Sequence, residues 1–488
     1  MSVLKNKPPF FTVLFLILII FLLICFVGLG RSPLYDWDEG IYAQVSRETK
    51  ILSPYWNGRP WFEKPPLVFW LTKASLAIFG ENEFGARFFM PILGTTTLIF
   101  FYLLARERLG DKAALLGLTF FLVAPLFMAR SQGLNTDMAL LAGVVASLFF
   151  LTKLEKKLIK KEKINFTNCF YPALMISLAV LAKGLMGFLP GLIWFVYLFI
   201  YRRGRLFKDF KVWLRVGIIT IVLVAPWHIY QTIRFGNEFW QVYLIEHIFR
   251  RAHQPIEYHF GGKLYYIKFL ISEFSWWLIP AALGGFYWLF EQINSKKKDN
   301  NFVFFLVWGG VVLTLFTFSK TKLFWYILPL YPVLAVLWGY GWQKTFSFGK
   351  NYFLIPLIFI LFWVFLNNYQ AFIGQKEITP SAKNILAKEA KVICPPPLLF
   401  LVNQNERNAA EILPDELTLT SSFSYGGSPS VVFYYARPVN FFYQTAQFEK
   451  GLAEKSTSVC AMITNEDYQN LGLNHKIINQ QKEWLLIK

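Results

Sequence analysis

The chain has 488 residues, of which 55% are hydrophobic and 19% aromatic, while only 16% are charged. A soluble domain carries roughly 25% charged residues. The deficit, together with repeated apolar runs near 18–20 residues, excludes a purely soluble protein and predicts a polytopic α-helical membrane protein. The net charge of +19 comes from short basic clusters between apolar runs, which is typical of membrane orientation signals. We therefore expect membrane lipids, and no nucleic acid, as partners.

The first apolar run, 10–30, follows Lys5 and Lys7. It is longer than the 7–15 apolar residues of a signal peptide, and no A-x-A-like cleavage site follows, so we expect a retained span. Windows of roughly 20 residues predict about eleven transmembrane helices in all. They lie near 10–30, 87–105, 113–129, 138–152, 168–182, 184–201, 212–230, 263–290, 302–318, 323–342 and 352–369.

Alternate loops are short and basic, and the bias of Lys and Arg toward the cytoplasm places them inside. They hold Lys5 and Lys7; Arg106, Arg108 and Lys112; residues 153–163; Arg202, Arg203, Arg205, Lys208 and Lys211; Lys296–Lys298; Lys344 and Lys350. We interpret them as orientation signals beside anionic lipid, without chemistry. The opposite loops, 31–86, 130–137, 231–262 and 319–322, carry nearly every unusual polar residue. This one-sided distribution predicts an extracytoplasmic site.

The last segment, 370–488, changes character, so we divide the chain into a transmembrane domain, 1–369, and this tail. Ser381–Lys391 reads as an amphipathic helix. The short apolar runs Leu398–Val402, Val431–Tyr435 and Val459–Thr464 read as strands. We expect a small α/β extracytoplasmic domain. Cys394 and Cys460 share this tail and could form a disulfide outside the cytoplasm.

The loop 31–86 interleaves acids with aromatic residues, which suits a site at a membrane surface. Its carboxylates at Asp38 and Glu63 are suited to general acid–base catalysis or to binding a hard cation. The alternatives are a solvated loop with interfacial anchors and, for Asp38, a cap on a helix that begins near Glu39.

The segment Glu63-Lys64-Pro65-Pro66 is more specific, because two prolines fix the direction of the residues before them. An ammonium at Lys64 suits a lipid phosphate, and Glu63 suits a metal or a sugar hydroxyl. Alternatively, Lys64 only extends to the headgroups. Four histidines lie in or near one outer loop without a zinc spacing. A cation bound by Glu63 and His247 is one possibility.

Three further positions are candidates on the same face. Asp137, two residues after Asn135, is a candidate site residue. The alternative is that this segment only provides the N-cap of the next span. Lys183-Gly184 interrupts an apolar run, where a charge is costly unless it faces a cavity or the interface. Lys320 and Lys322 break the cytoplasmic bias of their neighbours and suggest an anionic ligand, with headgroup contact as the alternative.

The order of these motifs resembles that of the GT-C membrane glycosyltransferases over about 31–345. The motifs are D-E-x-x-Y (Asp38, Glu39, Tyr42), F-E-K-P (Phe62–Pro65), F-G…F-x-x-R (Phe79 to Arg87), N-x-D (Asn135, Asp137), A-K-G (Ala182–Gly184), P-W (Pro226-Trp227) and S-K-x-K-L-x-x-Y-I-L-P (Ser319–Pro329). The most similar members are the 4-amino-4-deoxy-L-arabinose transferases that modify lipid A, and the protein O-mannosyltransferases are more distant. One position departs: Ile41 stands where the arabinose transferases have an arginine, so a phosphate contact of that family is expected to be missing.

The resemblance implies a sugar carried on polyprenyl phosphate and transfer at the periplasmic face of a bacterial inner membrane. It implies catalytic roles for Asp38, Glu39, Glu63, Lys64 and Asp137. It implies contacts to donor phosphate or lipid from Tyr42, Arg87, Lys183, Lys320, Lys322 and Tyr326. The resemblance also allows a divalent cation near the donor phosphate.

We therefore predict a monomeric glycosyltransferase that moves a pentose or hexose to lipid A or another envelope lipid or glycan. No nucleotide-binding glycine loop is present, which agrees with a lipid-linked donor. One alternative is transfer to a protein hydroxyl. A transporter or flippase for lipid-linked sugars would need charges at mid-membrane depth and pseudo-repeats, and the sequence shows neither.

Overall fold

A computed structural model describes residues 10–295, 299–345, 358–363, 366, 381–412, 419, 422–454 and 459–488. The chain forms two compact units. The bundle unit comprises Met1–Gly28, Phe88–Asn237 and Phe260–Gln375, and the loop-and-tail unit comprises Leu29–Arg87, Glu238–His259 and Lys376–Lys488.

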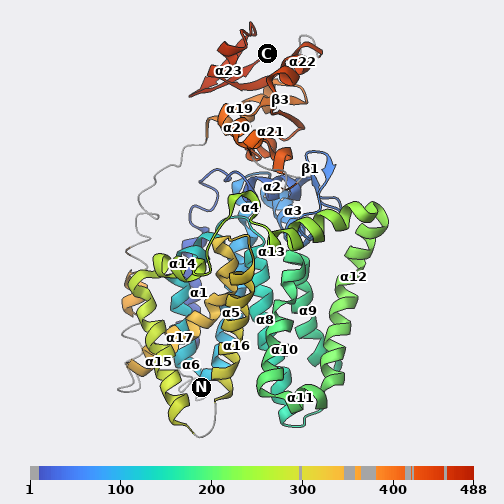
Figure 1. The fold of residues 1–488 in the computed structure, drawn as a ribbon. Coiled ribbons are helices and arrows are strands. Elements are labelled where there is room, and N and C mark those ends of the chain that lie inside the picture. The colour runs from blue at the N-terminus through green and yellow to red at the C-terminus, as the bar shows by residue number, and fades with distance from the viewer. Residues whose placement is uncertain are drawn as a thin grey trace, which may run out of the picture. The chain divides into compact units, whose positions relative to one another are not determined.

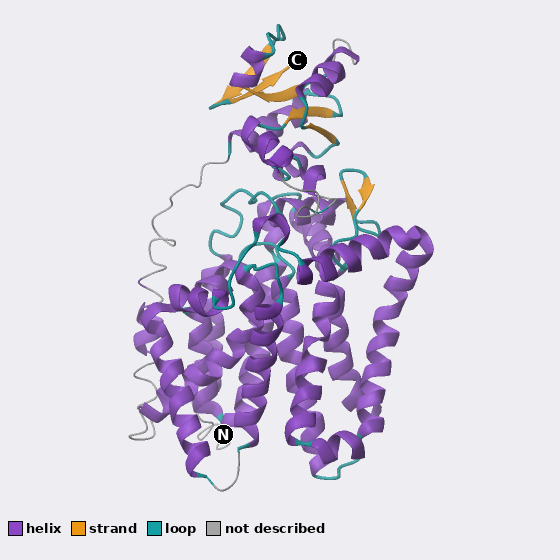
Figure 2. Cartoon of the chain, in the orientation of Figure 1, coloured by secondary structure: helices purple, strands orange, loops and turns teal. Residues whose placement is uncertain are grey.

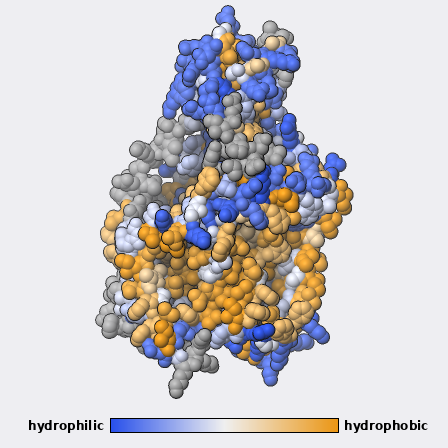
Figure 3. All heavy atoms as spheres, in the orientation of Figure 1, coloured by the Kyte–Doolittle hydropathy of each residue, from blue (hydrophilic) through white to orange (hydrophobic). Residues whose placement is uncertain are grey.

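The bundle unit is built mainly from long apolar helices, with two short helices of six residues each among them (Figure 1). They are α1 (Phe10–Phe26), α5 (Phe89–Leu109), α6 (Asp111–Leu122), α7 (Pro125–Arg130), α8 (Asp137–Ile159), α9 (Phe166–Lys183), α10 (Leu189–Tyr201), α11 (Arg203–Lys208), α12 (Phe210–Trp240), α14 (Tyr265–Phe274), α15 (Ile279–Asn294), α16 (Asn300–Phe318) and α17 (Tyr331–Thr345). On the visible face these helices carry a broad hydrophobic surface (Figure 3).

Seven helical segments among the described residues are long and apolar enough to cross a membrane. The prediction of a polytopic helical membrane protein is therefore confirmed. The predicted last span, 352–369, lies largely outside the described residues, as do Lys5, Lys7, Lys296–Lys298 and Lys350. The count of eleven stays a prediction.

Small residues let α17 pack closely against two neighbours. A Cβ added at Gly284 of α15 would lie 1.8 Å from the carbonyl oxygen of Leu337. One added at Gly339 would lie 2.1 Å from the carbonyl oxygen of Ala113, in α6. In lipid, where apolar surface gains little from leaving the solvent, such backbone contact is a main source of helix association.

Two predicted spans end at identifiable breaks. The span predicted over 113–129 stops at Leu122, and α7 starts at Pro125, which has no amide hydrogen to continue the preceding helix. α9 ends at Lys183, and Gly184 adopts φ +62°. The turn is close: a Cβ at Gly187 would lie 2.1 Å from the amide nitrogen of Val180.

A buried polar network ties four helices together at the end of the bundle predicted to be cytoplasmic. Arg108 donates to the Thr152 hydroxyl at 2.8 Å and lies 3.8 Å from the ring centroid of Phe304. Glu155 accepts from the Tyr197 hydroxyl at 3.2 Å and lies 3.9 Å from Arg108. Buried charges persist only when paired in this way, so the network fixes α5, α8, α10 and α16 relative to one another.

The loop-and-tail unit contains short helices and nearly all of the strands (Figure 2). Its elements before the tail are α2 (Asp38–Glu48), β1 (Tyr55–Trp56), β2 (Arg59–Pro60), α3 (Leu67–Phe79), α4 (Glu83–Arg87), the π-helical η2 (Gln241–Arg250), α13 (Arg251–His253) and η3 (Ile256–Tyr258). The tail adds α19 (Ala382–Ile393), β3 (Leu398–Leu401), α20 (Gln404–Ile412), η7 (Ser422–Tyr425), α21 (Ser430–Tyr435), β4 (Val439–Phe442), α22 (Thr445–Glu454), β5 (Ala461–Thr464), α23 (Asn465–Asn470), β6 (Ile477–Gln481) and β7 (Trp484–Ile487).

The five tail strands form one mixed sheet in the order β4-β3-β5-β7-β6. β3 is parallel to β4 and β5, and β7 is antiparallel to β5 and β6. Every residue of β3 and β7 is buried. The structure also pairs Cys394 with Cys460, at a Cα–Cα distance of 5.7 Å, which the sequence left open.

The predicted strand Val431–Tyr435 is wrong, because these residues form the helix α21. Pro429 precedes the helix at its N-cap, and Ala436 ends it in the left-handed conformation. All six helix residues are buried. Arg47 donates to the carbonyls of Val432 and Phe433, at 3.1 and 2.9 Å. Tertiary contacts therefore override the strand preference of β-branched and aromatic residues.

Candidate functional site

Arg87 and Glu39 form the buried scaffold at the base of the loop. The Arg87 guanidinium donates to both Glu39 carboxylate oxygens, at 2.7 and 2.6 Å. It also donates to the carbonyls of Leu29, Ser32 and Pro33, at 3.0, 2.7 and 2.9 Å. The side chains of the pair are only 3% and 5% exposed. Because these groups satisfy each other, both residues have a structural role, and the predicted catalytic role of Glu39 and phosphate contact of Arg87 stay predictions.

Asp38 directly precedes this scaffold and is the first residue of α2. The structure does not support the capping alternative, since the N-cap is Trp37 and no side chain caps the helix. Among the described residues, no hydrogen bond or ion pair engages the half-buried Asp38 carboxylate. Trp37 adopts φ +66° and ψ −128°, a conformation that costs a non-glycine residue about 1–3 kcal/mol. Such strain is concentrated at functional sites.

Glu63 is the second carboxylate of the candidate site, and it contacts the tail and a histidine of η2. One oxygen accepts a hydrogen bond from the Tyr425 hydroxyl, and the other lies 3.6 Å from Nε2 of His247. The same Tyr425 oxygen accepts from the Trp61 indole at 2.7 Å. His247 is buried, and neither of its ring nitrogens makes a hydrogen bond to the described residues. A buried imidazole without a hydrogen bond is unusual, which makes His247 a candidate functional residue.

Two cations lie near His247, the histidine beside Glu63. Lys64 and Arg251 lie close enough to His247 for their charges to act on it. Lys64 also donates to the Glu63 carbonyl at 3.1 Å. Burial lowers the pKa of His259, while Glu257 and Asp38 oppose that shift and Arg251 adds to it. Asp38, His259, Arg251 and the Glu63–His247 pair therefore belong to one electrostatic neighbourhood.

The pair of Glu63 and His247 fits part of a divalent-cation site. Two atoms that bind one zinc ion tetrahedrally, with bonds of about 2.1 Å, lie about 3.4 Å apart, close to the 3.6 Å between Nε2 and the Glu63 oxygen. The part of the chain that the structure describes holds no group of three or more His, Cys, Asp or Glu side chains that could bind a metal. Any cation here would need further ligands from water or substrate.

The tail supplies side chains to both loops of its unit, which the sequence did not predict. Ser422 donates to Glu257 at 2.6 Å. Ser430 donates to Asp36 at 2.5 Å through its hydroxyl and at 3.1 Å through its amide. No local signal in the sequence predicts the contact of Tyr425 with Glu63, since the two residues are 362 positions apart.

Tyr42, also predicted to contact the donor, lies in the core of the loop. Its ring is buried and packs edge to face on Trp61 and Phe69, with centroids 6.1 and 5.7 Å apart. The role of Tyr42 is therefore to support Trp61, which donates to Tyr425.

The bundle unit gathers a second set of predicted residues at one end of α8 and α9. Lys183 pairs with Asp137, whose other oxygen lies 4.0 Å from Arg130. The Lys183 ammonium lies 5.3 Å from the ring centroid of Tyr326, and Arg130 lies 4.3 Å from that of Trp325. Two cations face one carboxylate, so the cluster can attract an anion. Arg130 was missed, although it breaks the cytoplasmic bias as Lys320 does.

The two lysines of the Ser319–Pro329 motif differ. Lys322 is buried and donates to the carbonyls of Phe316 and Thr317, at 2.7 and 2.6 Å, at the end of α16. Burial, reinforced by the charge of Lys320, lowers the pKa of Lys322. Lys322 therefore caps a helix instead of presenting its charge to a donor, whereas Lys320 is exposed. A pocket shared by Lys320 and the carboxylates of the other unit stays a prediction.

The sequence of the chain is similar to those of several known proteins. The family described as "Dolichyl-phosphate-mannose-protein mannosyltransferase" matches residues 63–230. An uncharacterised Aquifex aeolicus protein is 30% identical over 406 residues, covering 80% of this chain and 86% of the relative. The "Undecaprenyl phosphate-alpha-4-amino-4-deoxy-L-arabinose arabinosyl transferase" of Pseudomonas aeruginosa is 28% identical over 69% of this chain. The chain spans 60% of the length of that enzyme.

The solved structures decide the fold. ArnT from Cupriavidus metallidurans, bound to undecaprenyl phosphate, superposes with a TM-score of 0.72 at 18% identity and covers 97% of both chains. The chain therefore has the fold of the GT-C membrane protein ArnT. The Archaeoglobus fulgidus oligosaccharyltransferase superposes on the ArnT-like chain with a TM-score of 0.55 at 14% identity, over 94% of this chain and 69% of that one. The predicted GT-C fold is confirmed.

Proposed function

We propose that this ArnT-like protein transfers a sugar from a polyprenyl-phosphate-linked donor to lipid A or another envelope lipid or glycan. Transfer takes place at the periplasmic face of a bacterial inner membrane. The observation that carries the proposal is the Asp38 carboxylate, which no described protein group neutralises, in the same unit as the Glu63–His247 pair. The names of the arabinosyl transferase and of the lipid-bound ArnT structure support the class of donor.

In the proposed reaction the acceptor hydroxyl attacks the anomeric carbon of the sugar and gives its proton to Asp38. The bond between that carbon and the phosphate oxygen breaks, and its electron pair leaves with the polyprenyl phosphate. An acceptor that is already anionic, such as a phosphate, needs no base, and Asp38 then positions it. Donors and charges aimed at the group that gains charge are usually the largest single contribution to such catalysis.

Lys64 and Arg251 are the cations of the loop-and-tail unit that could stabilise the departing phosphate. Lys183 and Arg130 are proposed to contact donor phosphate from the bundle unit, because Asp137 offsets only one of their two charges. A divalent cation on Glu63 and His247 would act as a Lewis acid on the same phosphate. Tyr425 and Trp61 would hold Glu63 in place.

Transfer to a protein hydroxyl is the second candidate, favoured by the match of residues 63–230 to the mannosyltransferase family. Both candidates use the same donor chemistry and the same carboxylates. They differ only in the acceptor.

The test is a transfer assay on purified full-length protein in detergent, with undecaprenyl-phosphate-linked pentose and hexose donors and an envelope lipid extract. The comparison is between wild type, Asp38→Asn and the matched control Asp36→Asn, in which a carboxylate bound to Ser430 is replaced two residues away. We expect a loss of at least about 100-fold for Asp38→Asn and near-normal turnover for Asp36→Asn. Full activity of Asp38→Asn would remove its role, and no transfer by wild type from any donor would overturn the proposal.

A further inference from the structure

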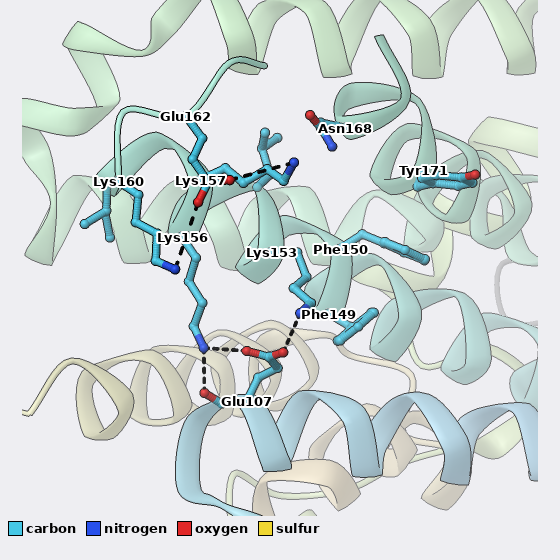
Figure 4. Close-up of a pocket in the computed structure, with 12 residues that line it drawn as sticks. Glu107, Phe149, Phe150, Lys153, Lys156, Lys157, Lys160, Glu162, Asn168 and Tyr171 are labelled. Atoms are coloured by element: carbon cyan, nitrogen blue, oxygen red, sulfur yellow. Dashed lines mark hydrogen bonds and ion pairs between the residues drawn. The ribbon is translucent and has the colours of Figure 1, made fainter. Parts of the chain in front are cut away.

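A basic pocket lies at the opposite end of α8 from Asp137, within the bundle unit. It has a volume of about 790 Å³ and lies between the end of α5, the last turns of α8 and the start of α9 (Figure 4). Residues 149, 153, 156, 157 and 160 follow the spacing of one helix face, so a single side of α8 supplies most of the wall. The sequence assigned this run only to membrane orientation.

The lysines of the pocket divide into two pairs, each facing one carboxylate (Figure 4). Lys153 and Lys156 each lie 2.5 Å from an oxygen of Glu107, which holds both ammonium groups firmly. Lys157 and Lys160 lie 3.9 and 4.0 Å from oxygens of Glu162. Those two distances are too long for hydrogen bonds, so these ammonium groups keep donors for a ligand. Four cations against two carboxylates leave the wall positive.

The other wall of the pocket is aromatic and apolar. Phe150 and Tyr171 stack with centroids 5.3 Å apart, and Phe149 lies 5.1 Å from Phe150. Ile159 and Tyr171 are 38% and 46% exposed. Exposed rings and aliphatic groups at the end of membrane-length helices are where acyl chains begin. The pocket therefore presents cations and hydrocarbon contacts side by side.

We propose that this pocket is a binding site for an anionic phospholipid of the cytoplasmic leaflet. The lipid phosphate binds Lys157 and Lys160, and its acyl chains lie along Phe150, Ile159 and Tyr171. A soluble anion would need the lysines but not the exposed apolar wall, which is why the observations favour a lipid. Basic pockets between transmembrane helices on this side of a membrane recognise such headgroups. The proposal does not depend on sugar transfer.

The test is native mass spectrometry of delipidated full-length protein titrated with phosphatidylglycerol, phosphatidylcholine or inorganic phosphate. Wild type is expected to retain phosphatidylglycerol in preference to phosphatidylcholine. The double variant Lys157→Gln/Lys160→Gln should bind phosphatidylglycerol roughly 30-fold more weakly, and Lys157→Arg/Lys160→Arg should retain it. The matched control Lys208→Gln/Lys211→Gln removes two exposed lysines from another cytoplasmic loop and should bind as wild type does.

Three outcomes would overturn the proposal. They are unchanged binding in the Gln variant, equal loss in the Lys208→Gln/Lys211→Gln control, and binding of inorganic phosphate as tight as that of the lipid. The last outcome would assign the pocket to a soluble phosphate instead.

Discussion

Two carboxylates of one loop meet opposite environments. Glu39 is held by both arms of the Arg87 guanidinium and by the amide of Tyr35, at 2.8 Å. Glu63 accepts a hydrogen bond from the Tyr425 hydroxyl and lies 3.6 Å from Nε2 of the buried His247. A buried ion pair such as that of Glu39 serves the fold, whereas a carboxylate beside a histidine is typical of a site that engages a substrate or cation. From the sequence we had predicted a catalytic role for both Glu39 and Glu63.

The largest effect that would test this contrast is the loss of Arg87. Arg87→Ala leaves Glu39 buried without its partner, which typically costs 3–5 kcal/mol. We expect little folded protein on size-exclusion chromatography and a much lower melting temperature. Arg31→Ala, at an exposed position, is the control. The double variant Glu39→Gln/Arg87→Met should recover most of the stability. A folded, stable Arg87→Ala protein would show that the pair is not the scaffold.

Loss of the Tyr425 hydroxyl should have a smaller effect than loss of Arg87. We expect this effect on turnover. Tyr425→Phe keeps the ring against Trp37 and Trp56, with centroids 6.4 and 5.1 Å away, but removes the hydrogen bond to Glu63. We expect about a tenfold drop in kcat/KM, which corresponds to about 1.4 kcal/mol, within the range of about 0.5–1.5 kcal/mol for a typical hydrogen bond.

The matched control is Tyr435→Phe, which removes a tail hydroxyl bound to the Pro395 carbonyl at 2.8 Å. It should leave turnover unchanged. An equal drop in both variants would mean that the tail affects activity only through its stability.

The smallest expected effect is on pH dependence. Burial lowers the pKa of His259 below its ordinary value of 6.5. As the pH falls below about 6.5, the unfolded state therefore takes up the proton before the folded state does, and the free energy of unfolding decreases. Above that pH the contribution is fully present. Melting temperatures at pH 7.5 and 5.5 should differ less in His259→Gln than in wild type, and an equal difference would contradict this assignment.

Sequence reasoning predicted much of the fold because hydropathy and Lys/Arg bias are local signals. The apolar runs, the break at Lys183 and the stiff Glu63-Lys64-Pro65-Pro66 segment all carried their information within a few residues. The pairing of Arg87 with Glu39, 48 positions apart, has no local signature. The same holds for Tyr425 and Glu63, which are 362 positions apart. The helix at Val431–Tyr435 was missed because its contacts with Arg47 come from a distant element.

The measurement that tests the contrast most directly compares Glu63→Gln with Glu39→Gln in the sugar-transfer assay, with turnover normalised to folded protein. We predict that Glu63→Gln melts like wild type and loses at least about 100-fold in kcat. Glu39→Gln should melt at a lower temperature and keep its turnover per folded molecule. Normal turnover in Glu63→Gln, with loss of turnover in a stable Glu39→Gln, would contradict the account.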